Sequence, residues 1–348
     1  MYPIEIIKYR TRRFDLCYDG RMNDTNKDLE VIRSQQLPDG LSLAGDGPNY
    51  QHVWIRDNVY VALAMQEAGQ HKAAARVYEA LCGIVAKYHT LLERKAYPTQ
   101  AENILPPRFT TDGARVEGEW SNKQHDAVGV LLFGLGRLYQ TDPSLLSDAM
   151  KKLCQQLVNY LEACQYFRDA DNGMWEEEAT LHASSLAACI KGIENVAAFC
   201  EHDEHMLASA KENLENLLPR ESVLHEVDLA QLSLVWPYGY LNADIVKAVE
   251  HTLLREHGVI RYVGDHYEAK DGEEPQWVMG LPWLGIAHFA LGNTDKARHY
   301  LHQTESLYTE NGLPESYLAS NKQCAHTPLA WSHAMALVLR SKLAQKQQ

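Results

Sequence analysis

Residues 59–92 read VYVALAMQEAGQHKAAARVYEALCGIVAKYHTLL and contain two helical segments of opposite character. The first, 59–69, is apolar around nearly its whole circumference, whereas the second, 71–92, carries Lys, Arg and Glu along one side. A helix that is apolar all round is buried inside a protein, and a one-sided helix lies on its surface. The stretch therefore predicts a buried helix next to a surface helix.

The same alternation continues along the chain, where helical periodicity predicts about twelve helices. The predicted surface helices span 28–37, 71–92, 143–167, 204–218, 243–258 and 294–308. The predicted buried helices span 59–69, 126–140, 183–202, 228–236, 278–292 and 327–345, of which 228–236 is short and shows the pattern weakly. This alternation favours an all-α fold, an (α/α)6 toroid or barrel in which an inner ring of helices is wrapped by an outer ring. A plain helical solenoid is the alternative architecture.

Strand signals are scarce, and the candidates are 3–9 and 258–269, so only minor β-structure is expected, in the loops. The residues before the first helix have room for a strand and a loop at most. The predicted organisation is an N-terminal extension, residues 1–24, followed by a single domain, residues 25–348.

Composition excludes several function classes. The net charge of −13 disfavours nucleic acid and anionic membranes as partners. The N-terminus lacks the pattern of a signal peptide, and no apolar run approaches the ~20 residues that span a bilayer. The 7 cysteines are widely spaced and never form a C-x-x-C pair, which indicates reduced thiols and a cytoplasmic protein. No cofactor motif and no complete metal-ligand set is present, so neither a cofactor nor a metal is expected.

Unusual residues cluster where the predicted buried helices begin. Tryptophans occur in these segments at Trp54, Trp120, Trp175, Trp277, Trp283 and Trp331, with carboxylates between them. In a toroid, the starts of the inner helices share one rim, so these side chains would surround one opening. Indole faces stack on the apolar faces of pyranose rings, and charged groups bind their hydroxyls. The pattern predicts a carbohydrate site.

Arg56 and Asp57 are two charges inside an otherwise apolar segment. At the N-terminus of a buried helix, the helix dipole favours the charge of Asp57. Both side chains would then face the opening and bind sugar hydroxyls. The alternative is that Asp57 is an ordinary first-turn acid and Arg56 its surface neighbour.

Several short motifs, in this order and spacing, resemble glycoside hydrolase family 15, the glucoamylase family, and the related domains of phosphorylase kinase regulatory subunits. They are W-I-R-D (54–57), W-x-x-x-Q-x-D-A (120–127), G-M-W-E-E (173–177), R-Y (261–262), G-x-P-W-L (280–284), G-L-P-E (312–315) and P-L-x-W-S-H-A (328–334). The resemblance extends from about Asp28 to the C-terminus, and it implies an (α/α)6 barrel.

The resemblance also implies roles for individual residues. Glu176 occupies the place of the general acid and Glu315 that of the general base. The residues implied in substrate binding are Arg56, Asp57 and Arg261 around the terminal glucosyl unit, Trp120 and Glu177 at the next position outward, and Trp54, Asp126, Trp175, Trp277 and Trp283 around the site. The family usually has Gln after the general base, whereas this chain has Ser316.

The implied chemistry is hydrolysis with inversion, which uses one carboxylic acid and one carboxylate roughly 6.5–9.5 Å apart. Burial and neighbouring acids are expected to raise the pKa of Glu176, as a proton donor requires. The expected protein is an exo-acting α-glucoside hydrolase that releases glucose from the non-reducing end of short α-glucans or oligosaccharides. The alternative is a non-catalytic carbohydrate-binding, regulatory module of the phosphorylase-kinase-subunit type.

Overall fold

The computed structural model describes residues 24–45, 47, 50–93, 103–116, 118, 123–267, 272–324 and 326–346. The candidate strand 3–9 lies outside these residues, and so does the predicted extension except for Asp24, where the first helix begins. Within the described part of the chain, every helix is too short or too polar to traverse a lipid bilayer. The cysteines in this part are all free thiols, and every one except Cys324 is buried.

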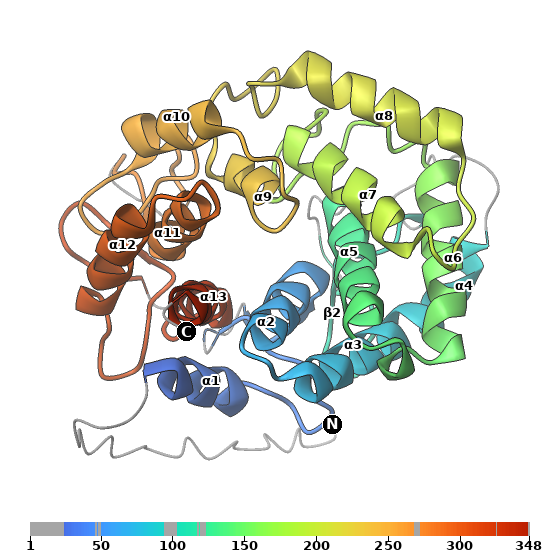
Figure 1. The fold of residues 1–348 in the computed structure, drawn as a ribbon, viewed down its shortest axis with the longest axis horizontal. Helices are drawn as coiled ribbons and strands as arrows, with labels where there is room; N and C mark the ends of the chain where they lie inside the picture. The colour runs from blue at the N-terminus through green and yellow to red at the C-terminus, as the bar shows by residue number, and fades with distance from the viewer. Residues whose placement is uncertain are drawn as a thin grey trace, which may run out of the picture.

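The helices form two concentric rings, as Figure 1 shows. The outer ring consists of α1 (Asp24–Ser34), α3 (His71–Val85), α6 (Asp148–Ala163), α8 (Glu204–Leu217), α10 (Ala243–Leu253) and α12 (Thr294–Ser306). The inner ring consists of α2 (Ile55–Glu67), α5 (His125–Thr141), α7 (Ala183–Val196), α9 (Leu232–Val235), α11 (Gly280–Ala290) and α13 (Ala330–Gln345). A further short helix, α4 (His89–Leu92), follows α3. The predicted (α/α)6 barrel is confirmed.

Burial follows the two rings, as the sequence alternation predicts. All of α2 except its last residue is buried, whereas α8 buries only Leu207, Ala210 and Leu214. Inner helices also approach one another closely. A Cβ on Gly129 of α5 would lie 2.5 Å from the backbone of Ala188 in α7, and one on Gly192 would lie 2.3 Å from the Gly129 carbonyl. Side chains larger than hydrogen do not fit where these two helices cross.

Some predicted helices are interrupted or shorter than expected. The 71–92 segment divides into α3, a 3-10 turn (Ala86–Tyr88) and α4, and the 143–167 segment into a 3-10 turn (Pro143–Leu145) and α6. The inner helix α9 has one turn, preceded by a 3-10 turn (Leu229–Gln231). The candidate strand 258–269 does not form in its described part. There Val259 makes only isolated bridges with Leu254 and Trp277, and the chain then bends so that Arg261 pairs with Asp265.

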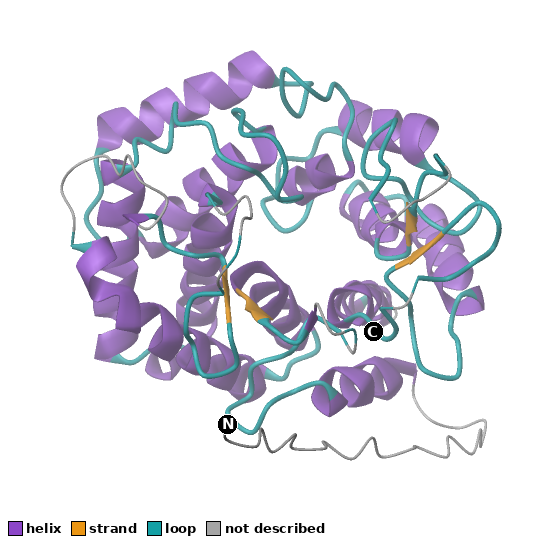
Figure 2. Ribbon diagram, turned by 180° about the vertical axis from the view of Figure 1, so that it is seen from behind, coloured by secondary structure: helices purple, strands orange, loops and turns teal. Residues whose placement is uncertain are grey.

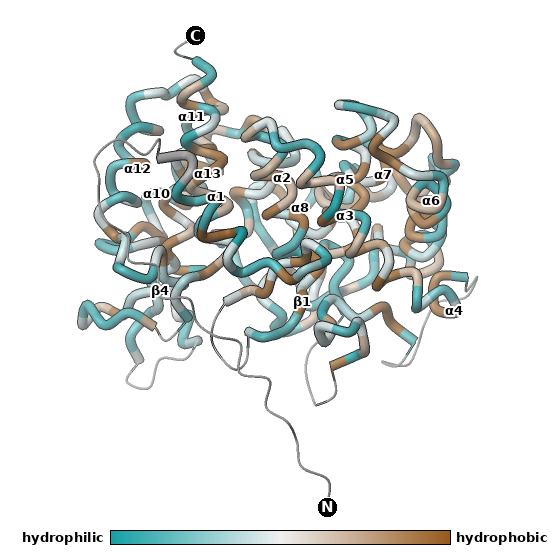
Figure 3. Tube along the Cα trace, turned by 90° about the horizontal axis from the view of Figure 1, so that it is seen from below, coloured by the Kyte–Doolittle hydropathy of each residue, from teal (hydrophilic) through white to brown (hydrophobic). Residues whose placement is uncertain are grey.

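Two very short antiparallel ladders hold loops at one edge of the barrel, seen in Figures 2 and 3. β1 (Val53–Trp54) pairs with β2 (Arg108–Phe109), and Trp54 lies opposite Arg108. β3 (Gln276–Trp277) pairs with β4 (Ser316–Tyr317), and Trp277 lies opposite Ser316. Since β1 leads into α2 and β4 follows Glu315, both ladders fix residues of the rim at which the inner helices begin.

The ring is closed by the first and last helices, which lie side by side in Figure 1. Asp28 of α1 is fully buried and accepts hydrogen bonds from His333 Nδ1 at 2.7 Å and Arg340 Nε at 3.1 Å, both on α13. The Leu313 backbone N–H donates to His333 Nε2, so Nδ1 of this ring carries the proton that Asp28 accepts. Tyr308 donates a further hydrogen bond to Asp28.

Candidate active site

A cavity of about 490 Å³ opens at the rim where the inner helices begin, and we call it the main cavity. Its walls come from the segments that precede α2, α7, α11 and α13, together with the first turns of α2 and α13. Predicted site residues in these walls are Trp54, Arg56, Asp57, Trp175, Glu176, Glu177, Arg261, Trp277 and Glu315. The prediction that the unusual residues gather at one rim is confirmed for these side chains.

Arg56 and Asp57 lie in the first turn of the buried helix α2 and line the main cavity. Arg56 Nη1 donates to Gln124 Oε1 at 2.7 Å and to Asp126 Oδ2 at 2.9 Å, and its guanidinium lies over the Trp331 ring. Burial raises the pKa of the Asp57 carboxyl, while the charge of Arg56 opposes that rise. The alternative of a surface arginine is wrong, because Arg56 is only 4% exposed.

Glu176 occupies a loop held in an unusual backbone conformation, with a φ of 63° that non-glycine residues seldom adopt. Its Oε1 accepts hydrogen bonds from Trp54 Nε1 at 2.9 Å and from Arg56 Nη2 at 3.3 Å. Burial raises the pKa of Glu176 even though Arg56 and Trp54 lower it. The predicted upward shift is therefore supported, with Asp57 as the like charge that contributes to it.

Glu315 is buried in the wall formed by the segment before α13. Its backbone is fixed by the Val278 N–H, which donates to its carbonyl at 2.9 Å. The Tyr50 hydroxyl donates to Glu315 Oε1 at 2.5 Å, and the Cys324 thiol lies 3.8 Å from Oε2. Burial, then the nearby charge of Glu315, raises the pKa of Tyr50 far above its ordinary value, so the phenol keeps its proton and donates it to this bond.

Arg261 lines the main cavity and is held by two acidic partners. It forms a bidentate ion pair with Asp265, at 2.8 and 2.6 Å, and its Nη2 lies 2.9 Å from Glu177 Oε1. Its guanidinium packs over the rings of Trp175 and Trp277. Such a planar, paired guanidinium is well suited to present its remaining N–H groups to hydroxyls.

Three predicted site residues are not seen in the cavity wall. Asp126 is buried and pairs with Arg56, so the structure shows an ion-pair partner of Arg56, and its predicted contact with substrate stays a prediction. Trp283 is fully buried and donates its indole N–H to the Trp236 carbonyl, since its position in α11 is a turn below the rim. Trp120 lies outside the described residues.

The sequence did not single out Tyr50, Arg108 and Tyr267, which also line the main cavity, or Asp265, which supports Arg261. None of these residues carried a usable signal, because the four-residue spacing of Arg261 and Asp265 favours pairing only on a helix, and this segment is a bend. Among the described residues, no group of three or more His, Cys, Asp or Glu side chains could hold a metal ion.

The family model described as glycosyl hydrolases family 15 matches residues 33–280, and the chain belongs to this family. The resemblance inferred from the short motifs is therefore confirmed. The matched range includes Glu176 and ends before Glu315.

Relatives of two kinds are found. The chain is 24% identical over 327 residues to the phosphorylase b kinase regulatory subunit alpha, skeletal muscle isoform, of Rattus norvegicus, an alignment that covers 75% of this chain and 26% of that protein. It thus spans about a quarter of the length of that relative. It is also 24% identical over 333 residues to an isomaltose glucohydrolase of Kribbella flavida, with 84% of both chains covered.

Solved structures share the fold. A glycosidase variant in complex with glucose is 23% identical, with a TM-score of 0.78 and coverage of 92% of this chain and 96% of that one. A bacterial glucoamylase complexed with acarbose is 17% identical, with a TM-score of 0.67 and coverage of 92% and 56%.

Proposed function

We propose that the protein is an inverting, exo-acting α-glucoside hydrolase that releases glucose from the non-reducing end of short α-gluco-oligosaccharides. The observation that carries the proposal is the presence of Glu176 and Glu315 in the walls of one cavity, beside Arg56, Asp57 and Arg261. Family membership and the likeness to an isomaltose glucohydrolase support it.

In this mechanism Glu176 is the acid. Its Oε1 is already engaged by Trp54 and Arg56, so the proton is carried on Oε2 and passes to the glycosidic oxygen as the bond to the anomeric carbon breaks. Glu315 accepts a proton from the attacking water, whose oxygen bonds to the anomeric carbon from the other side. The hydrogen bond from Tyr50 orients Glu315 for this task. Arg56, Asp57 and Arg261 bind hydroxyls of the glucosyl ring.

A substrate series tests the proposal. We expect glucose release from isomaltose, maltose or trehalose to exceed release from soluble starch, since the main cavity, of about 490 Å³, has the size of a site for a small ligand. The glucose first formed should be the β-anomer when followed by proton NMR. Retention of the α-anomer, or preference for long polymer, would contradict the proposal as stated.

The regulatory alternative is favoured by the phosphorylase b kinase regulatory subunits among the relatives. In that case the main cavity binds a sugar without turnover. Calorimetry would then record glucose or oligosaccharide binding while no member of the substrate series is hydrolysed.

The alkaline limit of activity is expected to depend on Trp54. Its indole N–H stabilises the charged form of Glu176 and so lowers the pKa of that carboxyl. Trp54→Phe removes this hydrogen bond, the pKa of Glu176 rises, and the acid stays protonated to higher pH. The alkaline limb of the kcat/KM profile should move to higher pH.

Trp331→Phe is the matched control for this experiment. Trp331 also lines the main cavity, but its buried indole nitrogen has no hydrogen-bond partner among the described residues. Its pH profile should keep the wild-type alkaline limb. An unchanged or lowered limb in Trp54→Phe would show that this bond does not control the acid.

A further inference from the structure

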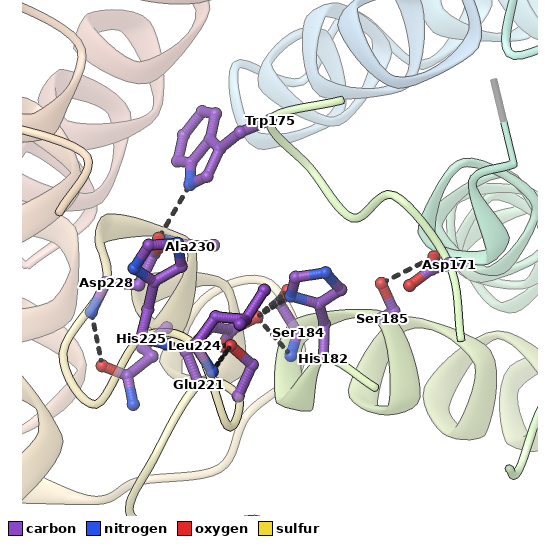
Figure 4. Close-up of polar contacts among 12 residues, drawn as sticks. Asp171, Trp175, His182, Ser184, Ser185, Glu221, Leu224, His225, Asp228 and Ala230 are labelled. Atoms are coloured by element: carbon purple, nitrogen blue, oxygen red, sulfur yellow. Dashed lines mark hydrogen bonds and ion pairs between the residues drawn. The ribbon is translucent and has the colours of Figure 1, made fainter. Parts of the chain in front are cut away.

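A hydrogen bond from Trp175 to Asp228 joins the loop that carries Glu176, residues 171–180, to the start of another inner helix, and we call this loop the acid loop. The Trp175 indole N–H donates to Asp228 Oδ1 at 2.7 Å, a bond that Figure 4 marks. Trp175 directly precedes Glu176, whereas Asp228 precedes the 3-10 turn that leads into α9. The bond therefore acts one residue away from the acid of the proposed mechanism.

Asp228 is itself held in place. It is 1% exposed, and its Oδ1 also accepts from the Ala230 backbone N–H at 2.7 Å. Its own backbone N–H donates to Gln231 Oε1 at 3.0 Å. Because these bonds fix both the side chain and the backbone of Asp228, this carboxyl group is a firm anchor for the indole of Trp175.

The backbone of Glu176 needs support from its neighbours. Its φ of 63° costs free energy for a residue with a side chain, and such a conformation persists only where surrounding contacts hold it. The Asn172 side chain donates to the Glu177 carbonyl at 2.6 Å, and the Glu177 N–H donates to the Asn172 carbonyl at 3.1 Å. These two bonds close the acid loop on itself, whereas the bond from Trp175 ties its tip to a different inner helix.

The position of the acid affects its chemistry directly. Displacement of a catalytic group by about 1 Å can lower a rate by about 10²-fold. Glu176 also accepts hydrogen bonds from Trp54 and Arg56, and it reaches them only while its loop presents the carboxyl group to them. A contact that fixes the acid loop therefore supports proton transfer from Glu176.

The bond from Trp175 does not require a charge on Asp228. Burial, followed by the nearby charge of Glu221, raises the pKa of Asp228 to about 7. A carboxyl oxygen accepts a hydrogen bond whether or not the other oxygen carries a proton. An amide oxygen at the same place should hold the indole equally well.

We propose that Asp228 is a positioning residue for the general acid, because it holds Trp175 and thereby keeps Glu176 in place to protonate the leaving oxygen. The inference rests on the proposed hydrolase function. Since Asp228 acts through Trp175, its loss should weaken proton donation more than it weakens substrate binding.

Asp228→Ala and Trp175→Phe each remove the bond, one from the acceptor side and one from the donor side. Two substrates separate proton donation from other defects. Phenyl α-glucoside has a poor leaving group that needs the acid, whereas 4-nitrophenyl α-glucoside has one that departs with little protonation. Both variants should lower kcat for the phenyl glucoside about tenfold more than kcat for the 4-nitrophenyl glucoside. A general loss of packing would lower both rates equally.

Two further variants serve as controls. Asp228→Asn keeps an oxygen that accepts from Trp175 and removes the charge, so it should retain the wild-type ratio of the two rates. Ser185→Ala removes a different hydrogen bond of the acid loop, since the Ser185 hydroxyl donates to Asp171 Oδ2 at 2.9 Å. It leaves Trp175 untouched and should also keep the wild-type ratio.

A second measurement needs no turnover. Burial raises the pKa of Glu176, so a displaced acid loop should return this pKa toward its ordinary, lower value. Titration of the Glu176 carboxyl carbon by NMR should show this fall in Asp228→Ala and Trp175→Phe. Asp228→Asn and Ser185→Ala should titrate as the wild type does.

An unchanged rate ratio together with an unchanged Glu176 titration in both bond-breaking variants would overturn the proposal. So would an Asp228→Asn variant that behaves as Asp228→Ala does, since the charge rather than the hydrogen bond would then matter. A wild type that hydrolyses neither glucoside would instead refute the proposed function. The titration then still decides whether Asp228 holds the acid loop in place.

Discussion

Glu176→Gln and Glu315→Gln are each expected to lower kcat for α-glucoside hydrolysis by roughly 10²–10⁴-fold, with a much smaller change in KM. Glutamine keeps the size of each side chain but cannot donate a carboxylic proton or take one from water. Glu176→Gln should be milder on α-glucosyl fluoride, because fluoride leaves without protonation. Glu315→Gln should be equally severe on both substrates. Initial rates of glucose release measure each effect.

Glu310→Gln serves as the control, since Glu310 is an exposed acid five residues before Glu315. It should retain wild-type rates. Circular dichroism of all three variants would confirm that the fold is kept. The hydrolase proposal fails if the wild type and both site variants are equally inert on every α-glucoside tested. The regulatory alternative, in which the main cavity binds a sugar without hydrolysing it, then explains the presence of the cavity.

The ring architecture could be predicted because the burial of a helix determines which residue types occur in each of its turns. An inner helix such as α2 is buried on all sides, and its residues from Val59 to Met65 are all apolar apart from the Tyr60 hydroxyl, whereas an outer helix such as α8 has one narrow buried stripe. The sequence signals for the exact ends of the helices are weaker. α9 is a single turn because a 3-10 turn precedes it and Pro237 follows closely, and such local breaks are decided by packing that periodicity does not record.

The sequence predicts which helix ends contribute to the site. It does not predict how far below the rim each side chain lies. Trp283 is the fourth residue of α11, so at 1.5 Å per residue it starts about 4.5 Å below the rim, inside the core. Trp331 is the second residue of α13 and lines the cavity. Tyr50 was missed because its partner Glu315 is 265 positions away in the sequence, and only closure of the ring brings the two together.

Ring closure itself is expected to depend on Asp28, and Asp28→Ala should lower the free energy of unfolding by about 3–5 kcal/mol. The substitution leaves the buried Arg340 guanidinium without its partner on α1, and it removes the acceptor for His333 Nδ1. Because these bonds join the first helix to the last, their loss should loosen α1 from α13 before the rest of the barrel unfolds. Urea unfolding followed by circular dichroism measures the change.

Glu30→Ala is the matched control on the same helix, since Glu30 is exposed. It should change the free energy of unfolding by less than about 0.5 kcal/mol. Hydrogen exchange should show faster exchange in α1 and α13 of Asp28→Ala, while α5 and α7, which pack closely against each other, keep their protection. Equal unfolding midpoints for Asp28→Ala and Glu30→Ala would mean that apolar packing of α1, rather than this buried ion pair, holds the barrel closed.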